Sequence, residues 1–153
     1  MRLCGQQAVW NYEEENGILT IQGVGAMEDY TEPEQVPWNS LMQEIKVVVI
    51  RDGITTVGDY AFAGCSNLQE VTLPGSVEIV GVFSFKGCTG LREIVIPEGV
   101  RVLASKAFQF CSALKKVYLP STLIDVDMRA FGKCESLEEV FYQGSEEQWE
   151  QIM

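Results

Sequence analysis

Four of the five cysteines are the first residues whose type and spacing could support chemistry. They are Cys65, Cys88, Cys111 and Cys134, and each follows the previous one by 23 residues. Four thiolates bind zinc only if all four sulfur atoms meet at about 2.3 Å from one ion. If the cysteines lie on strands stacked at about 4.8 Å, the outer two are instead roughly 15 Å apart. We therefore predict free, buried thiols that pack as small apolar side chains, with a disulfide between neighbouring cysteines as the alternative, and no metal or cofactor.

Side chains suited to catalysis are few. The chain contains no histidine, which is the usual base for a serine or cysteine nucleophile. Glu70, Glu93 and Glu139 share one repeat position, with Lys116 between the last two. Neighbours on stacked strands would lie about 5 Å apart, a separation that retaining glycosidases also use. An open sheet face offers no cleft that excludes water, so we interpret these residues as a solvated charge ladder and expect no enzymatic activity.

The cysteines belong to a longer pattern that must position them. Residues 61–74 (AFAGCSNLQEVTLP) recur in related form at residues 84–97 and 107–120. Aromatic and aliphatic positions recur with the same period: Phe62, Phe85, Phe108 and Phe131; Leu68, Leu91, Leu114 and Leu137; Val71, Ile94, Val117 and Val140. A period of this length indicates a solenoid, in which each unit buries its apolar face against its neighbours. Val71 and Leu73 alternate with Thr72, so each unit should contribute a short strand with these two side chains pointing inward.

The segment before the repeats should cover the first coil. Asn16-Gly17 lies between two strand-like runs, which predicts a hairpin closed by a type I′ turn. Pro37 can begin a helix. Four apolar residues would share one face of that helix: Trp38, Leu41, Met42 and Ile45. We therefore assign residues 1–44 to an N-terminal cap made of a β-hairpin and a short helix.

The segment after the repeats begins with a helix signal. Residues 145–148 (SEEQ) form a capping-box signature, and Trp149 and Ile152 follow on one side of the predicted helix. We assign residues 45–144 to the repeats and residues 145–153 to the start of a C-terminal capping helix. Because so short a helix is marginal on its own, we expect the chain to be part of a longer protein.

Composition narrows the possible partners. The 153 residues include 22 Asp and Glu against 11 Lys and Arg, for a net charge of -11. Nucleic acids and anionic membranes require a basic surface, so we expect neither as a partner. No apolar run approaches the length of about 18 residues that spans a bilayer, and residues 1–4 do not begin a segment typical of a signal peptide. We therefore expect one domain with a small cap and no membrane insertion.

The repeats resemble those of the BspA-like class of leucine-rich repeat proteins. The shared features are the Ala-Phe pair, the cysteine, the leucine and a strand that ends in Leu-Pro, and they extend over residues 45 to about 142. Residues 9–12 (VWNY) and the Pro37-Trp38 pair resemble the N-terminal cap of these bacterial proteins. The resemblance implies a β-rich α/β solenoid, a right-handed coil with a parallel concave sheet. It also implies an extracellular or cell-surface location. Phe110 and Lys133 replace the glycines of earlier repeats, which leaves the turn geometry open.

Side chains that point away from the core form the candidate binding site. The outward column of the strands is expected to be Val49, Thr72, Val95, Tyr118 and Phe141. Aromatic anchors in a polar rim are typical of protein interfaces, although aromatic and β-branched residues also suit strands in general. We predict a monomeric, non-catalytic protein-binding module, with a structural spacer as the alternative. The predicted protein-binding residues are Thr72, Glu93, Val95, Lys116, Tyr118 and Phe141.

Overall fold

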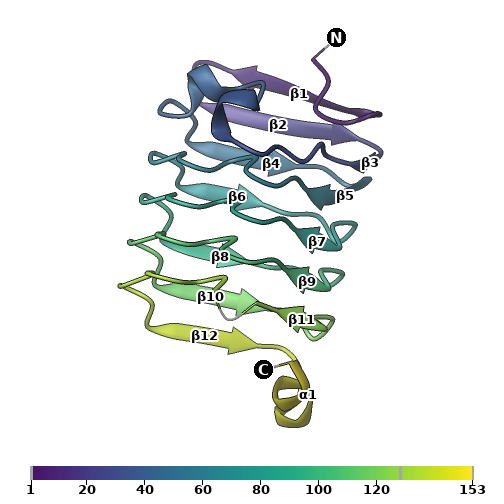
Figure 1. The fold of residues 1–153 in the computed structure, drawn as a ribbon, viewed down its shortest axis with the longest axis vertical. Helices are drawn as coiled ribbons and strands as arrows, with labels where there is room; N and C mark the ends of the chain where they lie inside the picture. The colour runs from purple at the N-terminus through teal and green to yellow at the C-terminus, as the bar shows by residue number, and fades with distance from the viewer. Residues whose placement is uncertain (1, 128, 153) are drawn as a thin grey trace.

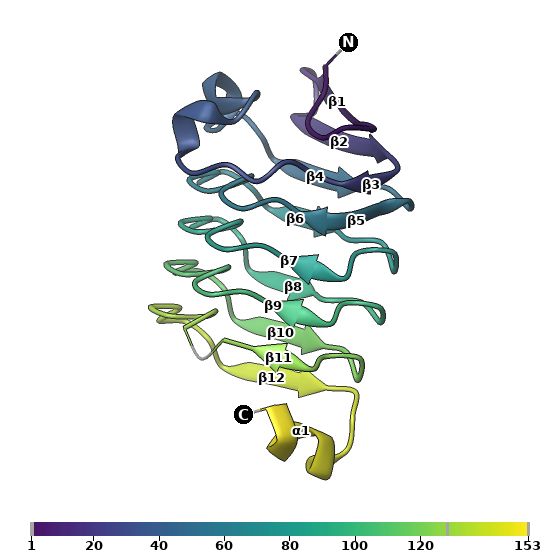
Figure 2. The ribbon, with the colours of Figure 1, turned by 45° about the vertical axis from the view of Figure 1, so that its right-hand side comes forward.

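The chain folds into a solenoid whose coils stack along the long axis (Figure 1). The computed structural model describes residues 2–127 and 129–152. Each repeat coil contributes one longer strand and one shorter strand, and equivalent strands of successive coils lie side by side in both views (Figure 2). The solenoid predicted from the 23-residue period is therefore confirmed, and its helical content is small.

The longer strands form two adjoining sheets. Their orders are β1-β2-β4-β6 and β12-β10-β8, and every neighbouring pair is parallel except β1 and β2. The strand bounds are β1 (Ala8–Glu13), β2 (Ile18–Gly23), β4 (Val47–Ile50), β6 (Glu70–Thr72), β8 (Glu93–Val95), β10 (Lys116–Leu119) and β12 (Glu139–Tyr142).

The shorter strands form a third, five-stranded parallel sheet in the order β11-β9-β7-β5-β3. Its strands are β3 (Gly25–Ala26), β5 (Ile54–Val57), β7 (Ile79–Val80), β9 (Val102–Leu103) and β11 (Asp125–Val126). Turns join each shorter strand to the next longer strand along the left edge of Figure 2.

The core is built from repeated side chains that pack on their own copies. The rings of Phe62, Phe85, Phe108 and Phe131 stack with centroids 5.2, 5.2 and 5.3 Å apart. These separations are close to the spacing of about 4.8 Å between hydrogen-bonded strands. Each ring of this column therefore contacts the ring one coil away, and the buried residues form one core that extends along the stack.

Residues in the left-handed backbone conformation form a corner turn in each coil. Gly64 and Gly87 have φ values of 81° and 74°, and Phe110 and Lys133 hold the same conformation at 63° and 60°. The replacement of glycine therefore keeps the turn geometry that the sequence left open. The Phe110 N–H donates a 2.9 Å hydrogen bond to the carbonyl of Gly132 in the next coil, which helps to fix the turn. A residue with a Cβ is disfavoured in this conformation by about 1–2 kcal/mol.

The N-terminal hairpin continues the longer-strand sheet, because β2 pairs in parallel with β4. The predicted hairpin is confirmed, but the prediction of a type I′ turn is wrong. Glu13 pairs with Ile18, so the loop contains four residues, and Gly17 alone among them has a positive φ. The Glu13 carboxylate accepts hydrogen bonds from the backbone N–H and the side-chain amide of Asn16, each at 3.0 Å. These bonds stabilise the wider loop.

The prediction of an α-helix that begins at Pro37 is also wrong. Two 3₁₀ helices replace it, η1 (Pro33–Gln35) and η2 (Asn39–Leu41), and neither has a side-chain cap. Trp38 lies between them, fully buried, with its ring stacked 5.5 Å from that of Phe62. Its indole N–H donates a 2.8 Å hydrogen bond to the carbonyl of Ala61. Because these contacts tie Trp38 to the first coil, the segment bends around it and the ring column begins there.

The C-terminal helix α1 (Glu146–Ile152) begins with the predicted capping box. The Gln148 N–H donates to the Ser145 hydroxyl at 3.1 Å, and the Ser145 N–H donates to the Gln148 side chain at 2.8 Å. The rings of Trp149 and Tyr142 lie 5.1 Å apart, which attaches α1 to the last strand. Val140, at an inward repeat position, is still 46% exposed, so α1 covers this end of the core only in part.

Ser84 gives a direct test of core packing. Its side chain is fully buried and its hydroxyl has no hydrogen-bond partner among the described residues, whereas the equivalent positions are Ala61, Ala107 and Ala130. An unsatisfied buried hydroxyl costs about 1–3 kcal/mol. We expect Ser84→Ala to raise the free energy of unfolding in urea by about 1 kcal/mol, and Ala107→Ser to lower it by about as much. A loss of stability in Ser84→Ala would mean that the hydroxyl is satisfied.

Candidate functional site

The outward side chains of β8, β10 and β12 form a continuous apolar surface. The strand register pairs Tyr118 with Val95 on one side and with Phe141 on the other. The rings of Tyr118 and Phe141 stack with centroids 4.9 Å apart and planes inclined by 15°. Val95 is 54% exposed and Phe141 is 38% exposed. We call Val95, Tyr118 and Phe141 the apolar column.

Thr72 flanks the apolar column from the neighbouring sheet. It is exposed and pairs with Val49 in β4. The described strands β6 and β8 lie side by side but belong to different sheets (Figure 1). The outward column predicted from the sequence is thus divided, with Val49 and Thr72 in one sheet and the apolar column in the other.

Charged side chains run beside the apolar column. Lys116 pairs with Glu93 and with Glu139 in the strand register, and all three side chains are exposed. Within the part of the chain that the structure describes, the one ion pair joins Arg129 to Asp127 at 3.6 Å. The described charges on this face are therefore solvated and available to a partner. The glutamates stand on an open face, which offers nothing to exclude water from a reaction.

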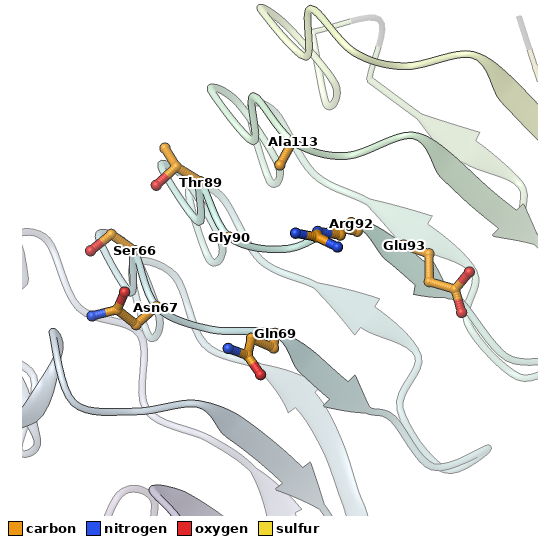
Figure 3. Close-up of a pocket in the computed structure, with 8 residues that line it drawn as sticks. All are labelled: Ser66, Asn67, Gln69, Thr89, Gly90, Arg92, Glu93 and Ala113. Atoms are coloured by element: carbon orange, nitrogen blue, oxygen red, sulfur yellow. The ribbon is translucent and has the colours of Figure 1, made fainter.

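A polar hollow of about 450 Å³ borders the charged side chains (Figure 3). It is lined by Ser66, Asn67, Gln69, Thr89, Gly90, Arg92, Glu93 and Ala113. These residues come from three successive coils, and Glu93 belongs both to the hollow and to the strand face. The hollow therefore extends the same surface with amide, hydroxyl and guanidinium groups.

No sequence motif marked this hollow. Its one sequence signal is a change of size at a single repeat position, where Asn67 is followed by Gly90 and Ala113. At Gly90 a Cβ would lie 2.9 Å from the carbonyl oxygen of Ser66, so the close approach of the two coils favours glycine there. Recognising that signal requires knowing that three coils meet there, which only the structure shows.

The repeated cysteines lie inside the core. All are free, with Cys65, Cys88 and Cys111 fully buried and Cys134 partly buried. Three thiols donate to a phenylalanine carbonyl in the preceding coil: Cys88 to Phe62 at 3.3 Å, Cys111 to Phe85 at 3.2 Å and Cys134 to Phe108 at 3.1 Å. The prediction of free, packed thiols is confirmed, and these hydrogen bonds add a structural role that the sequence did not indicate.

Among residues 2–127 and 129–152, no group of three or more His, Cys, Asp or Glu side chains is placed to hold a metal ion. Within the same residues, no helix has the length and apolar character required to cross a bilayer.

Together these features define a class of protein, a leucine-rich repeat solenoid that presents side chains on a strand face. A family description, "BspA type Leucine rich repeat region", matches residues 40–152 in six copies. The chain belongs to this family.

Solved structures of bacterial proteins share the fold. A leucine rich cell surface protein from Faecalibacterium prausnitzii has a TM-score of 0.78 at 23% identity, over 97% of this chain and 41% of that one. A leucine-rich repeat protein from Eubacterium ventriosum has a TM-score of 0.70 at 23% identity, over 92% and 43%. A leucine rich repeat protein of T. pallidum has a TM-score of 0.60 at 16% identity, over 94% and 84%. The chain spans less than half the length of the first two proteins. Comparison with curated proteins gave no match.

Thiol labelling tests whether the cysteine column is packed as described. Burial raises the pKa of the Cys65 thiol to about 12, so little reactive thiolate exists near pH 8. We expect Cys65, Cys88 and Cys111 to react with a maleimide on the order of a hundredfold more slowly in buffer than in denaturant, because reaction requires opening of the core. Partly buried Cys134 should react first. Mass spectrometry of the labelled fragments would measure each rate, and native labelling of the buried three at the denatured rate would contradict the packing.

Proposed function

We propose that this chain is a non-catalytic protein-binding module that uses the apolar column and its charged neighbours. The observation that carries the proposal is the stacked pair of Tyr118, which is partly exposed, and Phe141, which is exposed. The inward side chain of β10, Val117, is already fully buried, so the core does not need the outward rings. Cross-strand stacking stabilises a sheet by only about 0.2–1 kcal/mol per pair.

The surroundings of the pair suit a protein partner. Aromatic side chains in the centre of an interface contribute most of its affinity, and polar groups around them set orientation and exclude water. Here Glu93 and Lys116 provide opposite charges beside the rings, and the polar hollow provides hydrogen-bonding groups at the edge. Parallel ladders hold β8, β10 and β12 in place, so binding would order few backbone groups.

Each predicted site residue has a role in this proposal. Tyr118 and Phe141 are the anchors, and Val95 extends the apolar contact. Glu93 and Lys116 orient the partner, and Thr72 contacts it from the neighbouring sheet. None of these roles requires a catalytic group, a metal or a cofactor.

The proposed setting is the surface of a bacterium or its surroundings, where the module would serve adhesion or recognition. Support comes from the family and from the F. prausnitzii relative, which is described as a cell surface protein. The net charge of -11 disfavours nucleic acid and anionic membrane as partners, and the proposal takes the module to act as a monomer.

Aromatic truncation tests the proposal. A panel of extracellular proteins would first be screened for binding to the wild-type chain. For a partner so found, we expect Tyr118→Ala with Phe141→Ala to weaken binding on the order of thirtyfold or more, because anchors at an interface centre commonly contribute 2 kcal/mol or more. Circular dichroism should show an unchanged fold, since both side chains point outward.

A matched control truncates exposed apolar residues elsewhere. Val24 and Ile124 are 62% and 57% exposed, and their replacement by alanine should leave the affinity unchanged. Equal affinities of the aromatic double variant and the wild type would place the site on another surface. Failure of the wild type to bind any protein in the screen would favour the structural spacer.

A further inference from the structure

A second surface stands out along the turns at the left edge of Figure 2. Residues 58–64, 81–87, 104–110 and 127–133 carry four cations and two anions, in a chain whose net charge is -11. The cations are Lys86, Lys106, Arg129 and Lys133. The anions are Asp59, whose carboxylate accepts a 2.8 Å hydrogen bond from the Val82 N–H, and Asp127, which pairs with Arg129. Among the described residues, no carboxylate lies within ion-pair distance of Lys86, Lys106 or Lys133. This edge is therefore a basic strip on an acidic protein.

Aromatic rings hold two of these lysines in place. The rings of Tyr60 and Phe83 lie 5.0 Å apart in successive coils. The ammonium groups of Lys86 and Lys106 lie 4.9 and 5.5 Å from the centroid of the Phe83 ring. Attraction between an ammonium and a ring face restricts the lysine side chain but leaves N–H donors free. The two cations are thus positioned before any ligand arrives.

Five described residues of this edge have a positive φ although they are not glycine: Tyr60, Phe83, Lys106, Phe110 and Lys133. Phe110 and Lys133 have positive φ at the repeat position of Gly64 and Gly87, where glycine makes the same turn without strain. The Phe110 side chain is 46% exposed, so it fills little of the core. A strained side chain that the turn does not need is a candidate for a functional role.

The backbone of this edge is fixed by hydrogen bonds between coils. The Tyr60 N–H donates to the carbonyl of Val82 at 3.0 Å, and the Phe83 N–H donates to the carbonyl of Ser105 at 3.3 Å. A ligand would therefore meet a preformed surface, and little conformational entropy would be lost on binding.

We propose that this turn edge is a second binding site, which takes an acidic polypeptide segment that also carries apolar side chains. The site comprises Tyr60, Phe83, Lys86, Lys106, Phe110 and Lys133. Carboxylates of the segment pair with the lysine ammonium groups, and its apolar side chains pack on Phe110 and on the accessible edges of the other rings. A short peptide can cover the basic strip without contacting the acidic remainder of the chain. An extended polyanion or an anionic bilayer would also meet the acidic remainder of the chain, which repels it.

The test uses a fluorescein-labelled synthetic peptide rich in glutamate with interspersed leucine, and fluorescence anisotropy at physiological salt. We expect Lys86→Glu with Lys106→Glu to weaken binding on the order of tenfold or more, because both charge contacts become repulsive. The matched control, Lys46→Glu with Arg51→Glu, makes the same charge change at exposed residues that flank β4, and its affinity should stay within about twofold of the wild type.

Phe110→Gly separates a binding role from a structural role. We expect this variant to melt about 2–4 °C higher than the wild type, because strain is relieved, and yet to bind the peptide several-fold more weakly. A lower melting temperature would show that the fold needs the ring and would overturn the assignment of Phe110.

Several results would overturn the site itself. These are equal losses in the two charge-reversed variants, equal binding of a peptide with glutamine in place of glutamate, and preferential binding of heparin or phosphatidylglycerol vesicles. If Lys86→Glu with Lys106→Glu does not fold, Lys86→Gln with Lys106→Gln provides the same comparison. The Tyr118→Ala and Phe141→Ala double variant should bind the peptide like the wild type, so this site and the apolar column can fail independently.

Discussion

Every coil of the solenoid packs an aromatic ring against the ring of the coil before it. The column runs from Trp38 through Phe62, Phe85 and Phe108 to Phe131, with centroids 5.2 to 5.5 Å apart. Because this separation nearly equals the strand spacing, the rings, the strand ladders and the corner turns must all advance by one coil together. An inserted residue in one coil would disturb all three, which explains the constant period of 23 residues. The aligned cysteines follow from the same packing requirement and do not indicate metal or redox chemistry.

The requirement that equivalent side chains stack from coil to coil applies only to the inward side of each strand. Inward residues such as Ile94 and Val117 contact their own copies and are buried, whereas their neighbours Val95 and Tyr118 point outward and vary from coil to coil. The corner turns also separate backbone conformation from side-chain identity. The left-handed conformation is the same whether the position is occupied by glycine or by Phe110. Positions that stacking leaves free are where a solenoid can acquire binding residues without loss of its fold.

The sequence predicted the parts of the structure that depend on local or periodic patterns. The repeat period gave the coils, alternation gave the outward column, and residues 145–148 gave the capping box. Features that depend on contacts between distant segments were not predictable. Trp38 bends its segment into 3₁₀ helices because its indole reaches the carbonyl of Ala61, 23 residues away. The division between β6 and β8, the polar hollow and the lysines around Phe83 likewise arise from neighbouring coils, which a linear pattern does not reveal.

The inward side chains of the strands specify the fold, and the outward side chains contribute little to its stability. An alanine scan of β8 and β10, with the free energy of unfolding measured in urea, tests this claim most directly. The account predicts a loss of about 2–4 kcal/mol for Ile94→Ala and a somewhat smaller loss for Val117→Ala, because each leaves a cavity in the core. For Val95→Ala and Tyr118→Ala it predicts a loss below about 1 kcal/mol. Equal losses on the two sides of the strands would contradict it.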